Sequence, residues 1–241
     1  RLRLVSHAAR SAAATRNLGA ATAFGSILLF LDDDMVASAR LLEAHLAALQ
    51  DADVSVGYSR PALPARPTRW QRDARRWWED RFHAMAATGH RFSYEDLFSG
   101  NLALRAELFN SLGGFDVSFA GRLEDYELGV RLIKSGAKFC FSYSAAAAHF
   151  DQSDLDTWVR RVRLDGGAHV LLARHYPELR GALFGYVQIY AGPEVVLLRA
   201  LAFAAPQRGD TLLRLALLLI RLCEGMGTVS YTHLTLPTNR E

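Results

Sequence analysis

The chain has 241 residues and a mass of 26.7 kDa, enough for one large domain or for a domain with an appendage. Half of its residues are hydrophobic and 22% are charged, which excludes a largely disordered protein. The net charge of +3 suits a nucleotide or an anionic membrane surface but is too small to indicate binding to nucleic acid duplexes.

The two cysteines, Cys140 and Cys223, have neither a metal-binding nor a redox-active spacing. They predict no disulfide framework and suit a reducing compartment. No signal peptide is visible, and the chain opens at Arg1 inside an apparent strand, "RLRLVS". This opening is typical of a fragment.

Strands and helices alternate along the next 145 or so residues, to judge from apolar periodicity and turn formers. Further strands are predicted at residues 27–31, 53–59, 101–105 and 137–149. Helices are predicted at residues 15–24, 38–50, 70–87, 106–112 and 124–135. The alternation predicts an α/β fold, with a mostly parallel sheet flanked by helices.

Two of these helices have informative side chains. The helix at 38–50 has leucines at helical spacing, at positions 41, 42, 46 and 49. The helix at 70–87 follows a proline-rich surface loop and contains a stripe of aromatic residues, Trp70, Trp77, Trp78 and Phe82. Such stripes are more often core than ligand site, and we expect this one to be core.

Beyond residue 151 the pattern is helical, and it predicts a main domain at 1–180 with an apolar helical extension at 181–228. Arginines interrupt the apolar stretches 195–204 and 212–222, so neither reaches the ~18 residues that a membrane-spanning helix needs. These helices either pack on the domain or lie in a bilayer interface. The last residues, 229–241, resemble a translated sequencing adaptor and are predicted to be a non-native tail.

Three carboxylates, Asp32, Asp33 and Asp34, directly follow the apolar strand at 27–31. The carboxyl edge of an open α/β sheet is where ligands bind, and because these acids repel one another we expect them to face a cation or a cationic partner. A solvated acidic loop or a helix cap is the alternative. Two more polar motifs stand at predicted strand ends or just after them, "LED" at 123–125 and "HF" at 149–150.

In this order, together with "TRNLGAA" at 15–21 and "GNLALR" at 100–105, the motifs resemble the family 2 glycosyltransferases of the GT-A fold. The resemblance covers residues 2–179. It implies a nucleotide-sugar donor, a sugar or lipid-linked acceptor and a divalent metal, Mn²⁺ or Mg²⁺. It also implies a place in the cytoplasm, or at the inner face of the cell membrane. The family's opening strand, with its nucleotide-binding acid, does not precede "RLRLVS", which leaves base recognition incomplete.

The resemblance also implies roles for single residues. On the donor side, the nucleotide sugar is expected to contact Arg16, Asn17, Asp32 and Asp33. The metal is expected to bind Asp34 and His149. On the acceptor side, Asp125 is the base that takes the hydroxyl proton during inverting transfer, and the acceptor is held by Glu124, Gly100 and Asn101.

The residues themselves leave alternatives open. His149 is equally well explained by ordinary hydrogen bonds, and Asp125 by a cap on the helix that it begins. The run "FLDDDMV" also looks like the strand end of haloacid dehalogenase-type phosphatases, although the later lysine and acidic pair of that class do not follow. A degenerate domain that binds without catalysis is the third reading.

Overall fold

The structure, a computed structural model, describes residues 3–6, 8, 11–119, 122–151 and 153–183, with six isolated positions between 204 and 218. The chain divides into two compact units, Arg1–Arg66 with Trp78–Leu171 and Pro67–Trp77 with Leu172–Glu241. The predicted domain boundaries at residues 180 and 228 stay predictions, because most of the chain beyond residue 183 lies outside the described residues.

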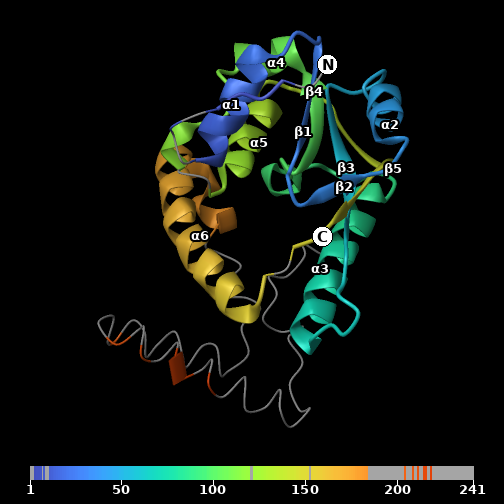
Figure 1. Cartoon of the computed structure of the whole chain (residues 1–241). Coiled ribbons are helices and arrows are strands. Elements are labelled where there is room, and N and C mark those ends of the chain that lie inside the picture. Colours follow the sequence, from blue (N-terminus) through green and yellow to red (C-terminus); the bar gives the residue numbers. More distant parts are fainter. Residues whose placement is uncertain are drawn as a thin grey trace. The chain divides into compact units, whose positions relative to one another are not determined.

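The first unit contains one sheet of five strands, in the order β1-β4-β3-β5-β2 (Figure 1). The strands are β1 (Ile27–Leu31), β2 (Met35–Ala37), β3 (Val54–Pro61), β4 (Asn101–Arg105) and β5 (Phe139–His149). Four of them were predicted from the sequence. The fifth, β2, has only three residues, which is too short for a hydrophobic pattern to reveal.

The expectation of a mostly parallel sheet is wrong at the level of neighbouring strands. Only β3 and β5 pair in parallel, whereas β1–β4, β3–β4 and β2–β5 are antiparallel. Strands β1, β3 and β5 still run in the same direction, because β4 is inserted in reverse between β1 and β3. Alternation of helices and strands predicts parallel neighbours only when each connection returns the next strand in the same direction. Here the chain returns beside β3, but β4 runs in the opposite direction.

The predicted opening strand is also corrected. Residues 3–6, the described part of "RLRLVS", belong to no strand. The side chain of Leu4 is 98% exposed. Alternating apolar residues form a strand only where a neighbouring strand takes their backbone hydrogen bonds, and none does so here.

Helices connect the strands where the sequence predicts them. They are α1 (Ala12–Thr22), α2 (Leu41–Ala48), α3 (Arg69–Ala86), α4 (Ala106–Ser111), α5 (Glu124–Lys134) and α6 (Leu155–His175). Short 3₁₀ turns are η1 (Tyr94–Asp96), η2 (Val117–Phe119) and η3 (Pro177–Leu179). Helix α1 begins after Ser11, whose Oγ accepts a hydrogen bond from the Ala14 amide at 3.1 Å.

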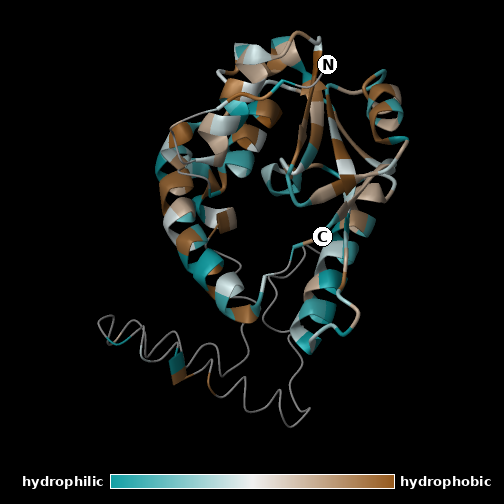
Figure 2. Ribbon diagram, in the orientation of Figure 1, coloured by the Kyte–Doolittle hydropathy of each residue, from teal (hydrophilic) through white to brown (hydrophobic). Residues whose placement is uncertain are grey.

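Helices cover both faces of the sheet (Figure 1). On one face, α1, α4 and α5 pack on the larger core, which includes Phe30, Val56 and Leu128. On the other face, Leu41 of α2 packs on Ala145 and Ala147 of β5. Figure 2 shows the strands of the sheet mostly in the colours of hydrophobic residues, as the burial of both cores requires.

The prediction that the aromatic stripe of α3 is core is confirmed in part: Trp70 and Phe82 are buried, whereas Trp77 and Trp78 are half-buried. Phe82 is buried and its ring stacks on Phe141 with centroids 5.7 Å apart. Trp78 meets Phe98 edge to face at 5.1 Å. In the second unit, Trp70 is also buried.

The leucines at helical spacing in and after α2 are not all buried. Leu41 and Leu49 are buried, but Leu42 and Leu46 are exposed. The third buried residue of this segment is His45, which lies four residues from each of the two buried leucines. Hydrophobicity alone misses this residue because a histidine can be buried wherever hydrogen bonds satisfy its ring.

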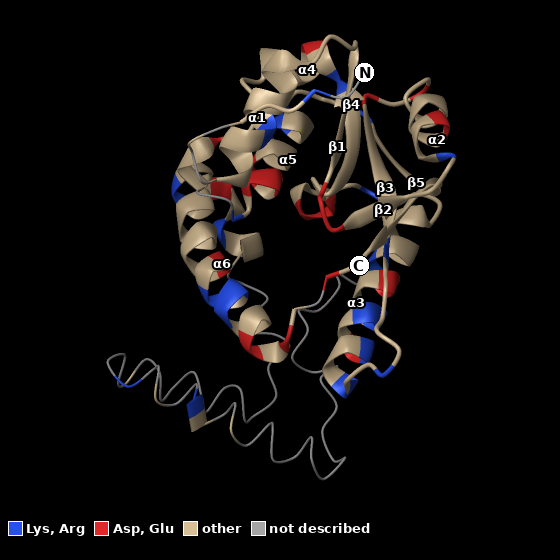
Figure 3. Cartoon of the chain, viewed as in Figure 1, with Lys and Arg blue, Asp and Glu red and all other residues tan. Residues whose placement is uncertain are grey.

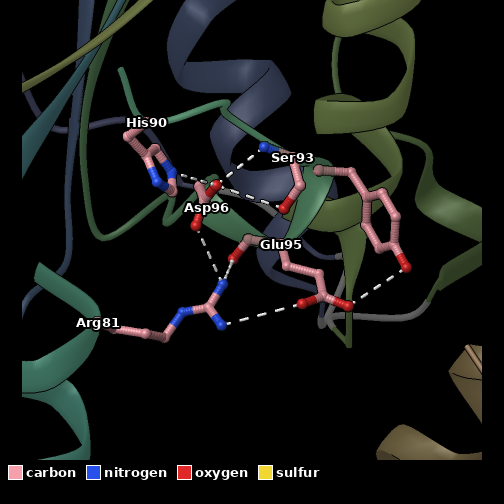
Figure 4. Close-up of polar contacts among 6 residues, drawn as sticks. Arg81, His90, Ser93, Glu95 and Asp96 are labelled. Atoms are coloured by element: carbon pink, nitrogen blue, oxygen red, sulfur yellow. Dashed lines mark hydrogen bonds and ion pairs between the residues drawn. The ribbon is translucent and has the colours of Figure 1, made fainter. Parts of the chain in front are cut away.

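A polar cluster fixes η1 at the approach to β4 (Figure 4). Asp96 is buried and accepts hydrogen bonds from the Ser93 amide at 2.9 Å and from Arg81 at 3.2 Å. The ring of His90 lies 3.0 Å from the same carboxylate. Arg81 also donates to the carbonyl of Glu95 at 2.6 Å. These contacts connect the end of α3, the following loop and η1. They therefore hold η1 in place just before Gly100 and β4.

No helix within the described residues is both long and apolar enough to cross a membrane. The apolar stretches 195–204 and 212–222 lie outside the described residues, apart from isolated positions. Their packing or membrane contact stays a prediction.

Candidate functional site at the carboxyl end of β1

Asp32 follows β1 directly, and the surrounding chain holds it in place. Its amide donates to the carbonyl of Gly100 at 3.0 Å, and one carboxylate oxygen, Oδ1, accepts from Arg16 Nη2 at 2.7 Å. A Cβ added at Gly100 would lie 2.8 Å from the other oxygen, Oδ2. Residue 100 must therefore be glycine for Asp32 to occupy this position. The structure shows Gly100 against Asp32, and its predicted contact with the acceptor stays a prediction.

Asp34 and His149 lie together, as the prediction of a shared metal requires. The antiparallel β2–β5 pairing places Met35 opposite His149, and the Phe150 amide donates to the Asp34 carbonyl at 2.9 Å. As a result, Nε2 of His149 is 3.2 Å from Oδ2 of Asp34. Asp33, the middle acid, is exposed.

The pair does not by itself make a metal centre. Within the described residues, no group of three or more histidine, cysteine, aspartate or glutamate side chains could hold a metal ion. A carboxylate and an imidazole are nevertheless ligands that Mn²⁺ accepts, and in a donor complex a diphosphate could complete the coordination. Asp34 and His149 thus fit a metal site only as a partial ligand set.

The second acidic motif, Glu124 and Asp125, begins helix α5. It follows Leu123, which has φ 58° and is the one non-glycine residue with positive φ in the described part of the chain. Backbone in this region is strained for a leucine and is typical of functional sites. The sequence offers no signal for it, because leucine is not a turn former.

Asp125 has a proton affinity suited to a general base. Burial, and after it the adjacent Glu124 carboxylate, raise the pKa of its carboxyl to about 7, against the lowering effects of the Tyr126 amide and Arg16. The Tyr126 amide donates to Asp125 Oδ1 at 2.9 Å. A carboxyl that titrates near neutral pH can accept a proton from a substrate and release it again.

Arg16 brings the two acidic motifs together. Its guanidinium donates to Asp32 at 2.7 Å and to Glu124 at 2.7 Å, and it lies 5.6 Å from the centre of the Phe115 ring. Figure 3 shows the acidic segment after β1 and the acidic first turn of α5 in the same region of the first unit. Glu124 is buried and paired with Arg16, and its role in holding the acceptor stays a prediction.

Two asparagines that the sequence assigns to ligands make hydrogen bonds within the protein. Asn17 exchanges two hydrogen bonds with the backbone of Phe115, both at 2.8 Å. Asn101 is fully buried; its amide nitrogen donates to the carbonyl of Ala145 at 2.9 Å. These hydrogen bonds occupy both amides within the protein, and their partners come from distant parts of the chain. Their roles in nucleotide-sugar and acceptor binding stay predictions.

His45 and Ser55 complete the network around Asn101 and were not expected from the sequence. Nε2 of His45 is 3.0 Å from Asn101 Oδ1, and its Nδ1 is 2.9 Å from Ser55 Oγ. Burial lowers the pKa of His45, outweighing the hydrogen bond to Asn101, which raises it. A neutral ring that donates from Nε2 and accepts at Nδ1 satisfies both contacts. The spacing Leu41, His45, Leu49 was the available signal.

Comparison with known proteins identifies the class. Residues 2–164, well over half of the chain, match the family described as "Glycosyltransferase like family 2". The chain belongs to this family, and its helix-flanked mixed sheet is consistent with the GT-A fold. Family membership also removes the phosphatase alternative.

Two curated relatives, from the CDC 1551 / Oshkosh and ATCC 25618 / H37Rv strains of Mycobacterium tuberculosis, are each named "Pre-mycofactocin glycosyltransferase". Each is 26% identical to this chain in an alignment of 208 residues that covers 80% of this chain. The match covers 43% of each relative, so the chain spans less than half of their length.

Proposed function

We propose that this domain transfers a sugar from a nucleoside diphosphate sugar to an acceptor hydroxyl, with inversion at the anomeric carbon and with Mn²⁺ or Mg²⁺ bound. The observation that carries the proposal is the Arg16 bridge, which joins the acid after β1 to the acidic start of α5. Donor and acceptor groups of such a reaction must meet in one place, and these two motifs do.

On the donor side, the proposal assigns Asp34 and His149 to the metal and Asp32 to the nucleotide sugar, at the ribose or at metal-bound water. The metal, when bound, would neutralise charge on the departing nucleoside diphosphate. Both terminal nitrogens of Arg16 donate hydrogen bonds to carboxylates, those of Asp32 and Glu124. We therefore assign Arg16 to holding Asp32 in place on the donor side, and not to contact with the nucleotide. Asp33, which is exposed, keeps its proposed donor contact.

On the acceptor side, the Asp125 carboxylate takes the hydroxyl proton as the oxygen attacks the anomeric carbon. The new bond joins this oxygen to the sugar, and the bond between the sugar and the diphosphate breaks. A pKa of about 7 leaves a substantial fraction of Asp125 ionised at neutral pH. The acceptor is proposed to be a sugar or a lipid-linked sugar, and pre-mycofactocin, from the relatives' name, is a further acceptor to test.

The test compares two substitutions in the full-length protein. Asp125→Asn keeps size but cannot accept a proton, so turnover should fall by roughly 10²–10⁴-fold while donor binding stays near wild type. Asp34→Ala should weaken donor binding as well, because a metal ligand is lost. Donor affinity is measured by calorimetry with Mn²⁺, and turnover by release of the nucleoside diphosphate.

The matched control is Asp51→Asn, the same substitution at an exposed acid in the turn before β3. Since β1 and β3 run in the same direction, this turn lies at the sheet edge opposite Asp32, and we expect wild-type turnover. An Asp125→Asn protein with near-normal turnover would contradict the base assignment. Donor binding without turnover in the unsubstituted protein would favour a domain that only binds.

A further inference from the structure

Both terminal nitrogens of Arg16 are bound to carboxylates of the protein itself. Its two terminal nitrogens reach carboxylates that lie 16 and 108 residues away in the sequence, Asp32 and Glu124. The side chains of Arg16 and Glu124 are only 17% and 7% exposed. A planar guanidinium with two charge-assisted hydrogen bonds holds both partners in a fixed geometry, which a single lysine nitrogen cannot do.

Asp125 is next to this ion pair and feels both of its charges. Burial and the Glu124 charge raise the pKa of Asp125, and the Arg16 charge lowers it. Several other ionisable groups lie on the elements around the start of α5. They are Asp32 after β1, Arg81 on α3, Glu95 at η1, Tyr126 on α5, Arg122 before α5, and Asp165 and His169 on α6. Of the side chains outside α5, Arg16 is the one that figures among the main influences on Asp125.

We propose that Arg16 is a positioning residue that ties the acid after β1 to Glu124 and so sets the pH range in which Asp125 can accept the acceptor's proton. The inference rests on the proposed role of Asp125 as the base. Arg16 itself touches neither the transferred proton nor the sugar. It acts through its own positive charge and through the position of Glu124, the neighbour of the base.

Two substitutions should move the acidic limb of the pH profile in opposite directions. Arg16→Gln removes a positive charge that favours the ionised form of Asp125. The midpoint of the acidic limb, the pH at which kcat/KM reaches half of its maximum, should therefore rise by about one pH unit. Glu124→Gln removes a negative charge that disfavours it, so the midpoint should fall by a similar amount, about one unit. Glu124→Gln leaves the Arg16–Asp32 ion pair in place, which gives a second test if Arg16→Gln folds poorly.

The same shifts can be followed without turnover, from the carboxyl carbon of Asp125 in a ¹³C NMR titration of the full-length protein. The control is Arg105→Gln, which removes a cation that donates to the Leu49 carbonyl at the opposite end of β4 and should leave the titration of Asp125 unchanged. Arg16→Lys keeps the charge but not the two-armed geometry, and should lower kcat with a nearly unchanged midpoint.

The outcomes separate this inference from the proposed function. If Asp125→Asn is inactive but neither Arg16→Gln nor Glu124→Gln moves the midpoint or the NMR titration, the inference on Arg16 is wrong and the base assignment stands. If Asp125→Asn is fully active, the proposed function fails, whatever the titrations show. Shifts in the same direction for both substitutions would also overturn the inference, because opposite charges must act oppositely.

Discussion

At the scale of single residues, the site depends on side chains that must approach closely. Gly100 has no side chain, and the space this leaves is occupied by the Asp32 carboxylate. A Cβ at this position would meet Asp32 Oδ2 and the Met35 methyl carbon, each at 2.8 Å. Contacts under 3.0 Å force a neighbour to move, and here one of the neighbours belongs to the site.

We therefore expect Gly100→Ala to impair function more than stability. Displacing Asp32 by about 1 Å should reduce turnover by up to ~10²-fold, because a small misplacement of a reacting group is costly. Turnover and the thermal unfolding midpoint are measured together. Gly166→Ala on α6, where nothing lies within 4 Å of the added Cβ, is the control. Equal turnover of the two variants would show that Asp32 tolerates the displacement.

At the scale of secondary-structure elements, the base is placed by the packing of α5 against η1. Gly129 lies in the middle of α5, and a Cβ there would be 2.8 Å from the carbonyl oxygen and 3.0 Å from the Cα of Tyr94. Both contacts are with backbone, so a side-chain rotation cannot relieve them. The polar cluster around Asp96 holds η1 from the other side (Figure 4).

Gly129→Ala should consequently destabilise the first unit. Overpacking of this kind costs ~1–3 kcal/mol, more than the ~0.5–1 kcal/mol that alanine gains in helix propensity. Urea unfolding followed by circular dichroism gives the change in free energy. The exposed helical control, Gly166→Ala, should be neutral or stabilising. A stabilised Gly129→Ala protein would mean that α5 and η1 separate at little cost.

At the scale of the whole molecule, buried His45 makes stability depend on pH. It joins α2 to β3 and β4 through Ser55 and Asn101. Burial lowers its pKa in the folded state, so the unfolded chain binds a proton at a higher pH than the folded one does. Its stabilising contribution is then complete above the unfolded pKa of ~6.5 and is lost as the pH falls below it.

The free energy of unfolding should accordingly fall between about pH 7 and pH 5, with a contribution from His45 of at most ~1.4 kcal/mol per pH unit. In His45→Gln, the free energy of unfolding, measured by urea titration at each pH, should depend less steeply on pH over this range. His83→Gln, at an exposed histidine of α3, should retain the wild-type slope. If the slopes of all three proteins coincide, His45 is protonated in the folded state without penalty.

Local pattern was enough to predict the main elements and the motif positions. Strand β1 followed from an unbroken apolar run, and the ends of α4 and α5 from Gly113 and Gly136, whose φ values are +81° and +77°. The acids after β1 and the histidine at the end of β5 were located for the same reason. Periodicity and turn formers act over a few residues, so they can be read without knowing the fold.

Only the tertiary structure decided what these residues contact. The reversed insertion of β4 buries Asn101 against His45, and the β2–β5 pairing brings His149 to Asp34. Arg16 meets Glu124 across 108 positions of sequence. A hydrophobic pattern states which side of an element is buried, but not which strand lies beside it or in which direction it runs. The partner of a polar side chain, and with it the side chain's role, depends on that choice.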